Sequence, residues 1–306
     1  FVDRAGASGA MPELNDEDAP VIASICRKLD GVALAIELAA RRVAAYGLQQ
    51  TAALLDERLS LSWLGQRTAQ PRHQTLQATL DWSYELLDMP ERLVLCRLSV
   101  FVGHFSLEAA REVAADQELT QVQVVDAVAS LAEKSLLSIR RSGTSTQYRL
   151  LESTRAYAHS KAGADLAESA ARRHAVYFRK RLEQMAEQDD AFSRDTARAS
   201  DLADLGNVRA ALAWCFDRAD ARELGVSLVL AAVPAFMAMS LLAECHDWSK
   251  RALAELGTGL AGSAAEMHLQ AAVGLSQMFT RGHSDEVRHA LERSLQVAEE
   301  LGDSRS

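Results

Sequence analysis

Residue types that could carry out chemistry occur in this 306-residue chain, but not at the spacings that known reactions need. No GxxxxGK[ST] phosphate loop is found, so we expect that the chain alone does not hydrolyse a nucleoside triphosphate. Gly6-Ala7-Ser8-Gly9-Ala10 comes close to a GxSxG nucleophile elbow. Its fifth residue is alanine, however, and no strand pattern precedes it. We therefore expect no catalytic residue and no enzyme activity in this chain.

Residues that could bind a metal are scattered as well. The eight histidines include neither an HExxH motif nor a pair four residues apart. The adjacent carboxylates Asp189-Asp190 and Glu299-Glu300 point apart on a helix, which favours a solvated surface over acid–base catalysis. The cysteines never form a CxxC pair, which is typical of small buried side chains in a reducing compartment; they are Cys26, Cys96, Cys215 and Cys245. We expect no metal site and no bound cofactor.

The composition favours helices, since alanine and straight-chain side chains lose little entropy in a helix. The net charge of −9 argues against general nucleic-acid binding, because phosphate contacts need an excess of Lys and Arg. No apolar run approaches the roughly 20 residues of a membrane span, and the start shows no signal-peptide pattern. We expect a cytoplasmic, mainly α protein without a membrane segment.

The first segment, residues 1–70, has the pattern of three helices. Ile22, Ile25 and Leu29 lie on one face of the first helix, and Gly31 follows as a C-cap. The pattern predicts a second helix over 33–46 that ends at Gly47, and a third over about 48–59. A loop at 60–71 marks a domain boundary.

The second segment, residues 71–163, has the outline of a winged helix. We predict helices at 73–87, 91–101, 107–115 and 121–134, with Ser106 as an N-cap and Thr120 with Gln123 as a capping box. Two β-prone runs at 136–141 and 146–151 surround a Gly-containing turn and predict a hairpin. On the last of the four helices, the expected buried stripe is Val122, Val125, Val128 and Leu131.

The third segment, residues 164–306, is predicted to be helical with breaks near Gly206, Gly225, Gly257-Thr258-Gly259 and Gly282. A faint repeat places Leu253 and Leu295 at equivalent positions 42 residues apart, each followed by Glu-Leu-Gly. This spacing is typical of tetratricopeptide-like helix pairs stacked into an α-solenoid, which leave a concave surface for a partner. We expect both leucines to be buried.

Residues 25–40, with the run Leu29-Asp30-Gly31-Val32-Ala33-Leu34, resemble the lid helices of signal-transduction ATPases with numerous domains (the NB-ARC class), and in particular bacterial ATPase-linked transcriptional regulators. Further matches follow in the same order and span nearly the whole chain; they are residues 71–76, 80–87, 98–101, 131–137, 148–157 and 207–214.

The resemblance implies a helical lid at 1–70, a winged helix at 71–163 and tetratricopeptide-like repeats at 164–306. A nucleotide-binding domain that holds ATP or ADP would precede the lid, and an output domain that binds DNA would lie outside this chain. By the same resemblance, Gly31, Ala33 and Leu34 lie at the turn that packs on adenine, although Ala33 stands where the family has proline. Glu152 lies where the family often has a Met-His-Asp motif, so the histidine that would touch the diphosphate is missing.

We interpret the whole protein as a switch, in which a protein or small-molecule inducer at the helical repeats releases a nucleotide-bound closed state. One alternative is a tetratricopeptide-like interaction scaffold, and another is a protein that binds DNA through its own winged helix. The helix predicted at 121–134 carries Asp126 and Glu133 and only one cation, Lys134, which argues against base reading. Arg140, Arg141 and Arg149 in the hairpin are the contrary observation.

Overall fold

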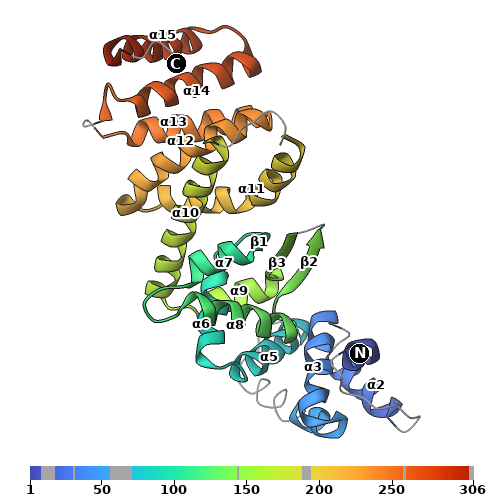
Figure 1. Cartoon of the computed structure of the whole chain (residues 1–306). Coiled ribbons are helices and arrows are strands. Elements are labelled where there is room, and N and C mark those ends of the chain that lie inside the picture. Colours follow the sequence, from blue (N-terminus) through green and yellow to red (C-terminus); the bar gives the residue numbers. More distant parts are fainter. Residues whose placement is uncertain are drawn as a thin grey trace. The chain divides into compact units, whose positions relative to one another are not determined.

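The computed structural model describes residues 1–7, 18–29, 32–55, 71–142, 145–187, 194–257 and 260–302. Two compact units are present, and their elements are labelled in Figure 1. The first comprises Phe1–Ser99 with Ser106–Gly163, and the second comprises Val100–Phe105 with Ala164–Ser306. The segment expected to form the lid and the winged helix are thus parts of one unit, and a boundary between them stays a prediction.

The first unit begins with the helices α1 (Val2–Ala7), α2 (Ala19–Lys28) and α3 (Ala33–Tyr46), and residues 48–55 are also helical. Helix α3 has the predicted bounds and ends at Gly47, whose φ of +74° is easy only for glycine. The apolar faces form one core; it consists of Ile25, Leu29, Ala35, Ala39, Val43, Leu48, Leu55 and Trp82. Gly31 lies outside the described residues.

The winged helix follows in the order helix, strand, helix, helix, hairpin, helix. Its elements are α5 (Pro71–Glu85), α6 (Met89–Leu98), β1 (His104–Ser106), α7 (Leu107–Ala114), α8 (Gln121–Glu133), β2 (Ser138–Ser142), β3 (Ser145–Arg149) and α9 (Glu152–Lys161). The sheet order is β1-β3-β2, with β2 and β3 antiparallel and Ile139 opposite Tyr148. Both the Ser106 N-cap and the Thr120–Gln123 capping box are confirmed. The short strand β1 was not predicted.

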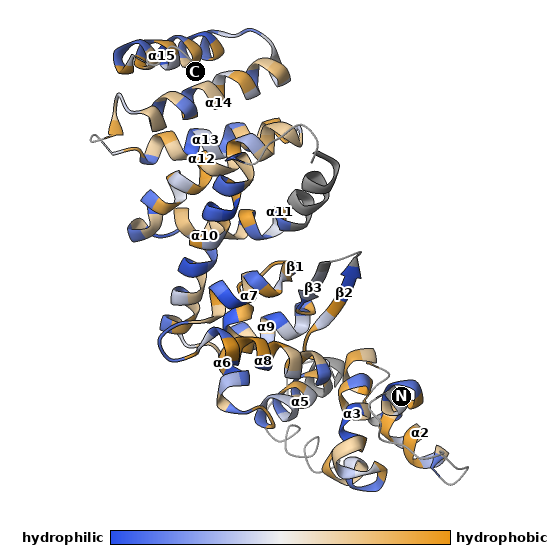
Figure 2. Ribbon diagram, in the orientation of Figure 1, coloured by the Kyte–Doolittle hydropathy of each residue, from blue (hydrophilic) through white to orange (hydrophobic). Residues whose placement is uncertain are grey.

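The core of the winged helix lies between α6, α7 and α8, and Figure 2 shows strongly hydrophobic stretches in α6 and α8. The buried residues of α8 are Val124, Ala127, Val128 and Leu131, whereas Val122 is 71% exposed. The predicted stripe was therefore wrong at its start. Residues spaced by three drift around a helix of 3.6 residues per turn, so Val122 and Leu131 lie on opposite sides of α8.

The second unit consists of helices; they are α10 (Ala164–Glu187), α11 (Arg194–Phe216), the 3₁₀ turn Ala219–Ala221, α12 (Arg222–Ala238), α13 (Leu242–Glu255), α14 (Ala264–Arg281) and α15 (Asp285–Leu301). Consecutive helices pack together, and α12 also packs on α10 and α14, the order of stacked helix pairs (Figure 1). The chain turns at Gly257 and at Gly282, as predicted.

Two of the predicted breaks were wrong, because Gly206 lies inside α11 and Gly225 lies inside α12. Both glycines serve close packing instead. A Cβ atom at Gly225 would lie 3.0 Å from the Cys215 Cβ, and one at Gly206 would lie 3.0 Å from the Val102 carbonyl oxygen. A glycine inside a helix weakens it modestly, and here the close contacts account for its presence.

The predicted equivalence of Leu253 and Leu295 was also wrong. Leu253 is half-buried, whereas Leu295 is 61% exposed. Helix α15 packs on α14 through the side that carries Val297 and Ala290, and Leu295 lies on the far side from Val297. The faint repeat at 42 residues therefore marks two similar helices, and it does not mark equivalent buried positions.

Helix α12 is apolar on all sides, and the stretch Ala219–Ala238 is long and apolar enough to cross a membrane by length and composition. The sequence reading missed this stretch because Asp220, Arg222 and Glu223 interrupt its start. Leu228, Val229 and Phe236 are buried, and α12 packs against α10, α11 and α13. A helix that is hydrophobic all round is expected at the centre of such a stack.

Candidate functional site

Helix α8 has the position of the helix that reads DNA bases in winged helices that bind DNA. Its exposed side offers few side-chain hydrogen-bond donors that are not already engaged. Its exposed residues are Gln121, Val122, Gln123, Asp126, Ala129 and Glu133. The Gln121 Oε1 accepts a hydrogen bond from Arg111 at 2.5 Å, and its Nε2 donates to Glu112 at 3.2 Å. The Gln123 Oε1 accepts from the Thr120 backbone at 2.9 Å. Both glutamines that could read adenine are thus already engaged.

Lys134, at the end of α8, is engaged as well. Its Nζ donates to the Glu91 carboxylate, which also accepts hydrogen bonds from the Ser130 hydroxyl and from the Asp88 backbone. Burial raises the pKa of Glu91, but the hydrogen bonds from Lys134, Ser130 and Asp88 outweigh it and hold that pKa below its usual value. The one cation of α8 therefore stabilises the fold of the winged helix.

The C-terminal end of α8 is held by helix α3. Arg41 donates to the Glu133 carbonyl oxygen, and the Ser135 hydroxyl donates to the Glu37 carboxylate at 2.9 Å. A cation at the C-terminus of a helix also suits the helix dipole. These contacts, which the sequence did not predict, join the winged helix to helix α3 within the first unit.

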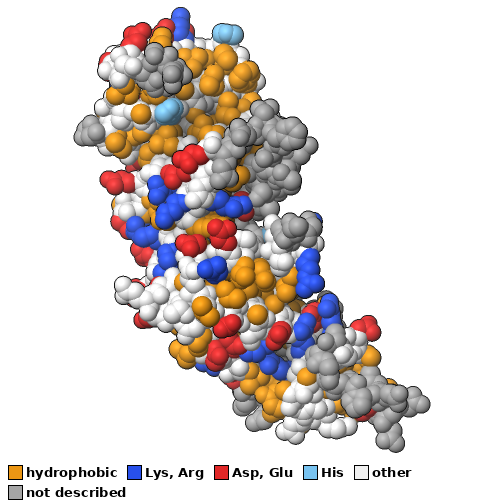
Figure 3. All heavy atoms as spheres, in the orientation of Figure 1, with side chains coloured by type: hydrophobic (Ala, Val, Ile, Leu, Met, Phe, Trp, Pro, Cys, Tyr) orange, Lys and Arg blue, Asp and Glu red, His pale blue; other side chains and the backbone are white. Residues whose placement is uncertain are grey.

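The β2–β3 hairpin is the most basic part of the winged helix. Arg140, Arg141 and Arg149 are exposed, and no ion pair is found for Arg140 or Arg141 within the described residues. Arg140 lies opposite Gln147, so Arg140 and Arg149 share one face of the hairpin while Arg141 lies on the other. Residues 87–162 carry nine Lys and Arg against nine Asp and Glu. Figure 3 shows basic and acidic side chains interspersed on the visible face, without one continuous basic patch.

The described residues expected near a nucleotide lie on two helices, α3 and α9. Ala33 is the exposed first residue of α3, and Leu34 is half-buried. Glu152 opens α9 with its side chain 72% exposed, paired with Arg155 at 2.6 and 3.0 Å. The hydrogen bond from Arg155 lowers the pKa of Glu152. This geometry fits an acidic residue that stabilises the first turn of a helix.

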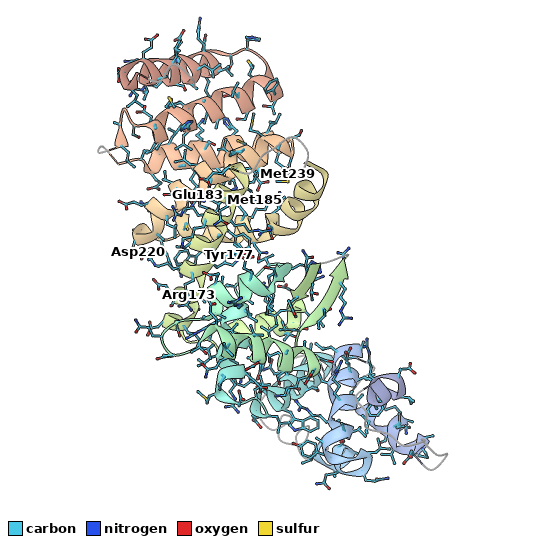
Figure 4. All side chains as sticks on the ribbon, viewed as in Figure 1. Arg173, Tyr177, Glu183, Met185, Asp220 and Met239 are labelled. Atoms are coloured by element: carbon cyan, nitrogen blue, oxygen red, sulfur yellow. The ribbon has the colours of Figure 1, made fainter. Side chains whose placement is uncertain are left out.

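The second unit contains a small pocket between α10, α11 and α12, with a cavity volume of about 20 Å³. Its walls are mainly apolar and include Phe178, Phe236, Met185 and Met239; the two methionines are labelled in Figure 4. One ion pair lines it, with Arg181 Nε 2.6 Å from Asp204 Oδ2. Burial raises the pKa of Asp204, although the ion pair with Arg181 acts to lower it.

Metal-ligating side chains do not gather in the described part of the chain. No group of three or more His, Cys, Asp or Glu residues that could hold a metal ion is found there. All four cysteines are free thiols; Cys96, Cys215 and Cys245 are buried, and Cys26 is half-buried. Burial raises the pKa of Cys215 to about 12, so its thiol stays protonated and unreactive at neutral pH.

Known proteins match this chain in the winged helix and beyond it. The model of a winged helix-turn-helix domain matches residues 87–162, which agrees with the helix and hairpin order described above. A putative HTH-type transcriptional regulator of Mycobacterium tuberculosis (strain ATCC 25618 / H37Rv) is 35% identical over 249 residues, 81% of this chain and 28% of the relative. A relative of the same description from Mycobacterium bovis has the same identity and coverage. An uncharacterized protein of M. tuberculosis is 40% identical over 162 residues, 53% of this chain and 41% of the relative. The chain thus spans less than half the length of these relatives.

Proposed function

We propose that the chain is the regulatory region of a transcription regulator, in which the winged helix links a helical lid to a set of helical repeats. The observation that carries this proposal is the winged helix-turn-helix domain at residues 87–162, together with relatives described as putative HTH-type transcriptional regulators. The likeness to those relatives extends over 81% of the chain, well beyond the winged helix.

In finer detail, we propose that the whole protein is a cytoplasmic signalling ATPase that binds ATP or ADP through a domain preceding the lid. The lid-like sequence around Gly31, Ala33 and Leu34 supports this assignment, and the chain itself has no GxxxxGK[ST] phosphate-loop motif. The stacked helix pairs support a tetratricopeptide-like sensor, and a protein or small-molecule inducer would bind on these helical repeats.

Within this scheme the winged helix acts as a hinge, and DNA is bound by a part of the whole protein outside this chain. Three features of α8 favour the hinge. Its glutamines are bound by Arg111 and Thr120, its exposed side carries Asp126 and Glu133, and its C-terminal end is held by the lid. Exposed carboxylates would repel the phosphates on either side of a DNA groove.

A second candidate function, direct DNA binding by the winged helix, is favoured by the hairpin. Arg140 and Arg141 are exposed and free of ion pairs among the described residues, as arginines that contact phosphates would be. Two or three such contacts add affinity that falls steeply with salt and carries little sequence information.

The test is a fluorescence-anisotropy titration of the full 306-residue chain with duplex DNA at low salt. The proposed hinge predicts weak binding that is the same in the wild type and in the double variant Arg140→Ala/Arg141→Ala. The matched control, Arg222→Ala/Arg288→Ala, removes two exposed arginines from the second unit. Tight, salt-sensitive binding that only the hairpin variant abolishes would assign DNA binding to the winged helix and overturn the hinge.

A further inference from the structure

Asn207 is fully buried in α11, and both polar atoms of its side-chain amide are bound to the main chain of the segment Val100–Phe105. Its Oδ1 accepts a hydrogen bond from the Val102 backbone at 2.7 Å, and its Nδ2 donates to the His104 carbonyl oxygen at 3.0 Å. One side chain thus satisfies two main-chain groups of the segment, which would otherwise lose their partners on burial.

The surroundings of Asn207 are fitted to the same segment. Gly206, the residue before it, has no side chain, and a Cβ atom there would come within 3.0 Å of the Val102 carbonyl oxygen. On the α10 side, the Nε2 of the buried His174 lies 3.4 Å from the Asn207 Oδ1. The ring of Phe101 meets the edge of His174 at 5.0 Å and stacks on Phe105 at 4.4 Å. The segment Val100–Phe105 is therefore held by the hydrogen bonds with Asn207, by close packing against Gly206 and by aromatic packing.

The segment has an unusual place in the chain. By its contacts Val100–Phe105 belongs to the second unit, yet in the sequence it connects α6 to α7 inside the winged helix-turn-helix match. His104, which accepts the hydrogen bond from Asn207, is also the first residue of β1. A change in the packing of α11 that moves Asn207 consequently removes a main-chain partner at the start of β1.

We propose that Asn207 is a positioning residue that makes the stability of the winged helix depend on the packing of the helical repeats. The inference rests on the proposed regulatory function, because a sensor needs a physical route to the domain that it controls. Coupling of this kind requires an element that both regions stabilise, and the segment held by Asn207 is such an element. Loss of the amide is expected to remove this dependence while leaving each region folded.

The test is a double-mutant cycle read by hydrogen–deuterium exchange on the full chain. Val229→Ala perturbs the repeats, since Val229 is fully buried in α12. With Asn207 present, Val229→Ala is expected to speed amide exchange in α12 and also in residues 100–105 and α7. Asn207→Ala alone is expected to speed exchange at residues 100–105 by roughly tenfold or more, because two hydrogen bonds are lost. In the double variant, α7 should show no further change relative to Asn207→Ala.

The proposal is overturned if Val229→Ala leaves α7 unchanged in the presence of Asn207, or changes α7 equally with and without it. If Asn207→Ala does not fold, Asn207→Asp serves in the same cycle. The aspartate keeps an acceptor for the Val102 backbone and loses only the donor to His104. Neither DNA nor nucleotide enters the measurement, so its failure is distinguishable from a failure of the proposed function.

Discussion

The Ser135 hydroxyl donates a hydrogen bond to the Glu37 carboxylate at 2.9 Å, and Ser135 does so from a left-handed backbone conformation with φ of +60°. The residue directly follows the C-cap of α8. Its N–H donates to the Ala132 carbonyl oxygen at 3.1 Å and the next N–H donates to Leu131 at 2.9 Å, the two bonds of a Schellman motif. Glycine usually occupies this position, so the serine side chain links the end of α8 to α3 at a cost in backbone strain.

Two substitutions at Ser135 separate the contribution of its hydrogen bond to Glu37 from the cost of its strained backbone conformation. Ser135→Ala loses the hydrogen bond to Glu37 and keeps the strained φ, so we expect it to lower the free energy of unfolding by about 1–2 kcal/mol. Ser135→Gly also loses the hydrogen bond but relieves the strain, and we expect it to be more stable than the alanine variant by about 1 kcal/mol. Urea unfolding of both variants measures the difference. A glycine variant no more stable than the alanine variant would contradict the strained conformation.

The capping box of α8 gives a second prediction with an internal control. Thr120→Ala removes the side-chain acceptor for the Gln123 backbone N–H, and we expect a loss of about 1 kcal/mol in the free energy of unfolding. Val122→Ala, two residues along, changes a side chain that is 71% exposed and should stay within about 0.5 kcal/mol of the wild type. A cost of 2 kcal/mol or more at Val122 would instead support the buried stripe that the sequence suggested.

Local signals in the sequence predicted the local structure well. The bounds of α3, the Ser106 N-cap, the Thr120 capping box and the β2–β3 hairpin depend on residues within a few positions of each other. Such features can be read from spacing alone, because the partners are neighbours in the chain. The buried stripe predicted on α8 was wrong at Val122, because valines at every third position were counted without following the turn of the helix.

Features that depend on distant partners could not be predicted. Gly206 and Gly225 look like helix breaks until the helix or segment that packs against them is known. Likewise, Ser135 is an ordinary serine in the sequence, and its partner Glu37 lies 98 residues away. Of the expected nucleotide site, Gly31 lies outside the described residues, and the roles of Ala33, Leu34 and Glu152 depend on the family resemblance and stay a prediction.

His174 gives a prediction for the dependence of stability on pH. Its side chain is 2% exposed, and burial lowers its pKa to about 4, although the hydrogen bond with Asn207 raises that pKa slightly. The unfolded chain should titrate this histidine near its ordinary pKa of about 6.5. Between these two values the unfolded state binds a proton that the folded state does not, so stability falls as the pH is lowered from about 6.5 to about 4.

The size of this effect can be isolated with one variant. A shift from about 6.5 to about 4 corresponds to about 3 kcal/mol of stability that is present above pH 6.5 and lost by pH 4. Carboxylates also titrate in this range, so the comparison is with His174→Gln, which keeps a hydrogen-bonding side chain and does not titrate. We expect the free energies of unfolding, measured with urea at several pH values, to converge for the two proteins as the pH falls. Parallel curves between pH 4 and 6.5 would show that His174 is protonated in the folded chain and that the packing around Asn207 accepts a charge.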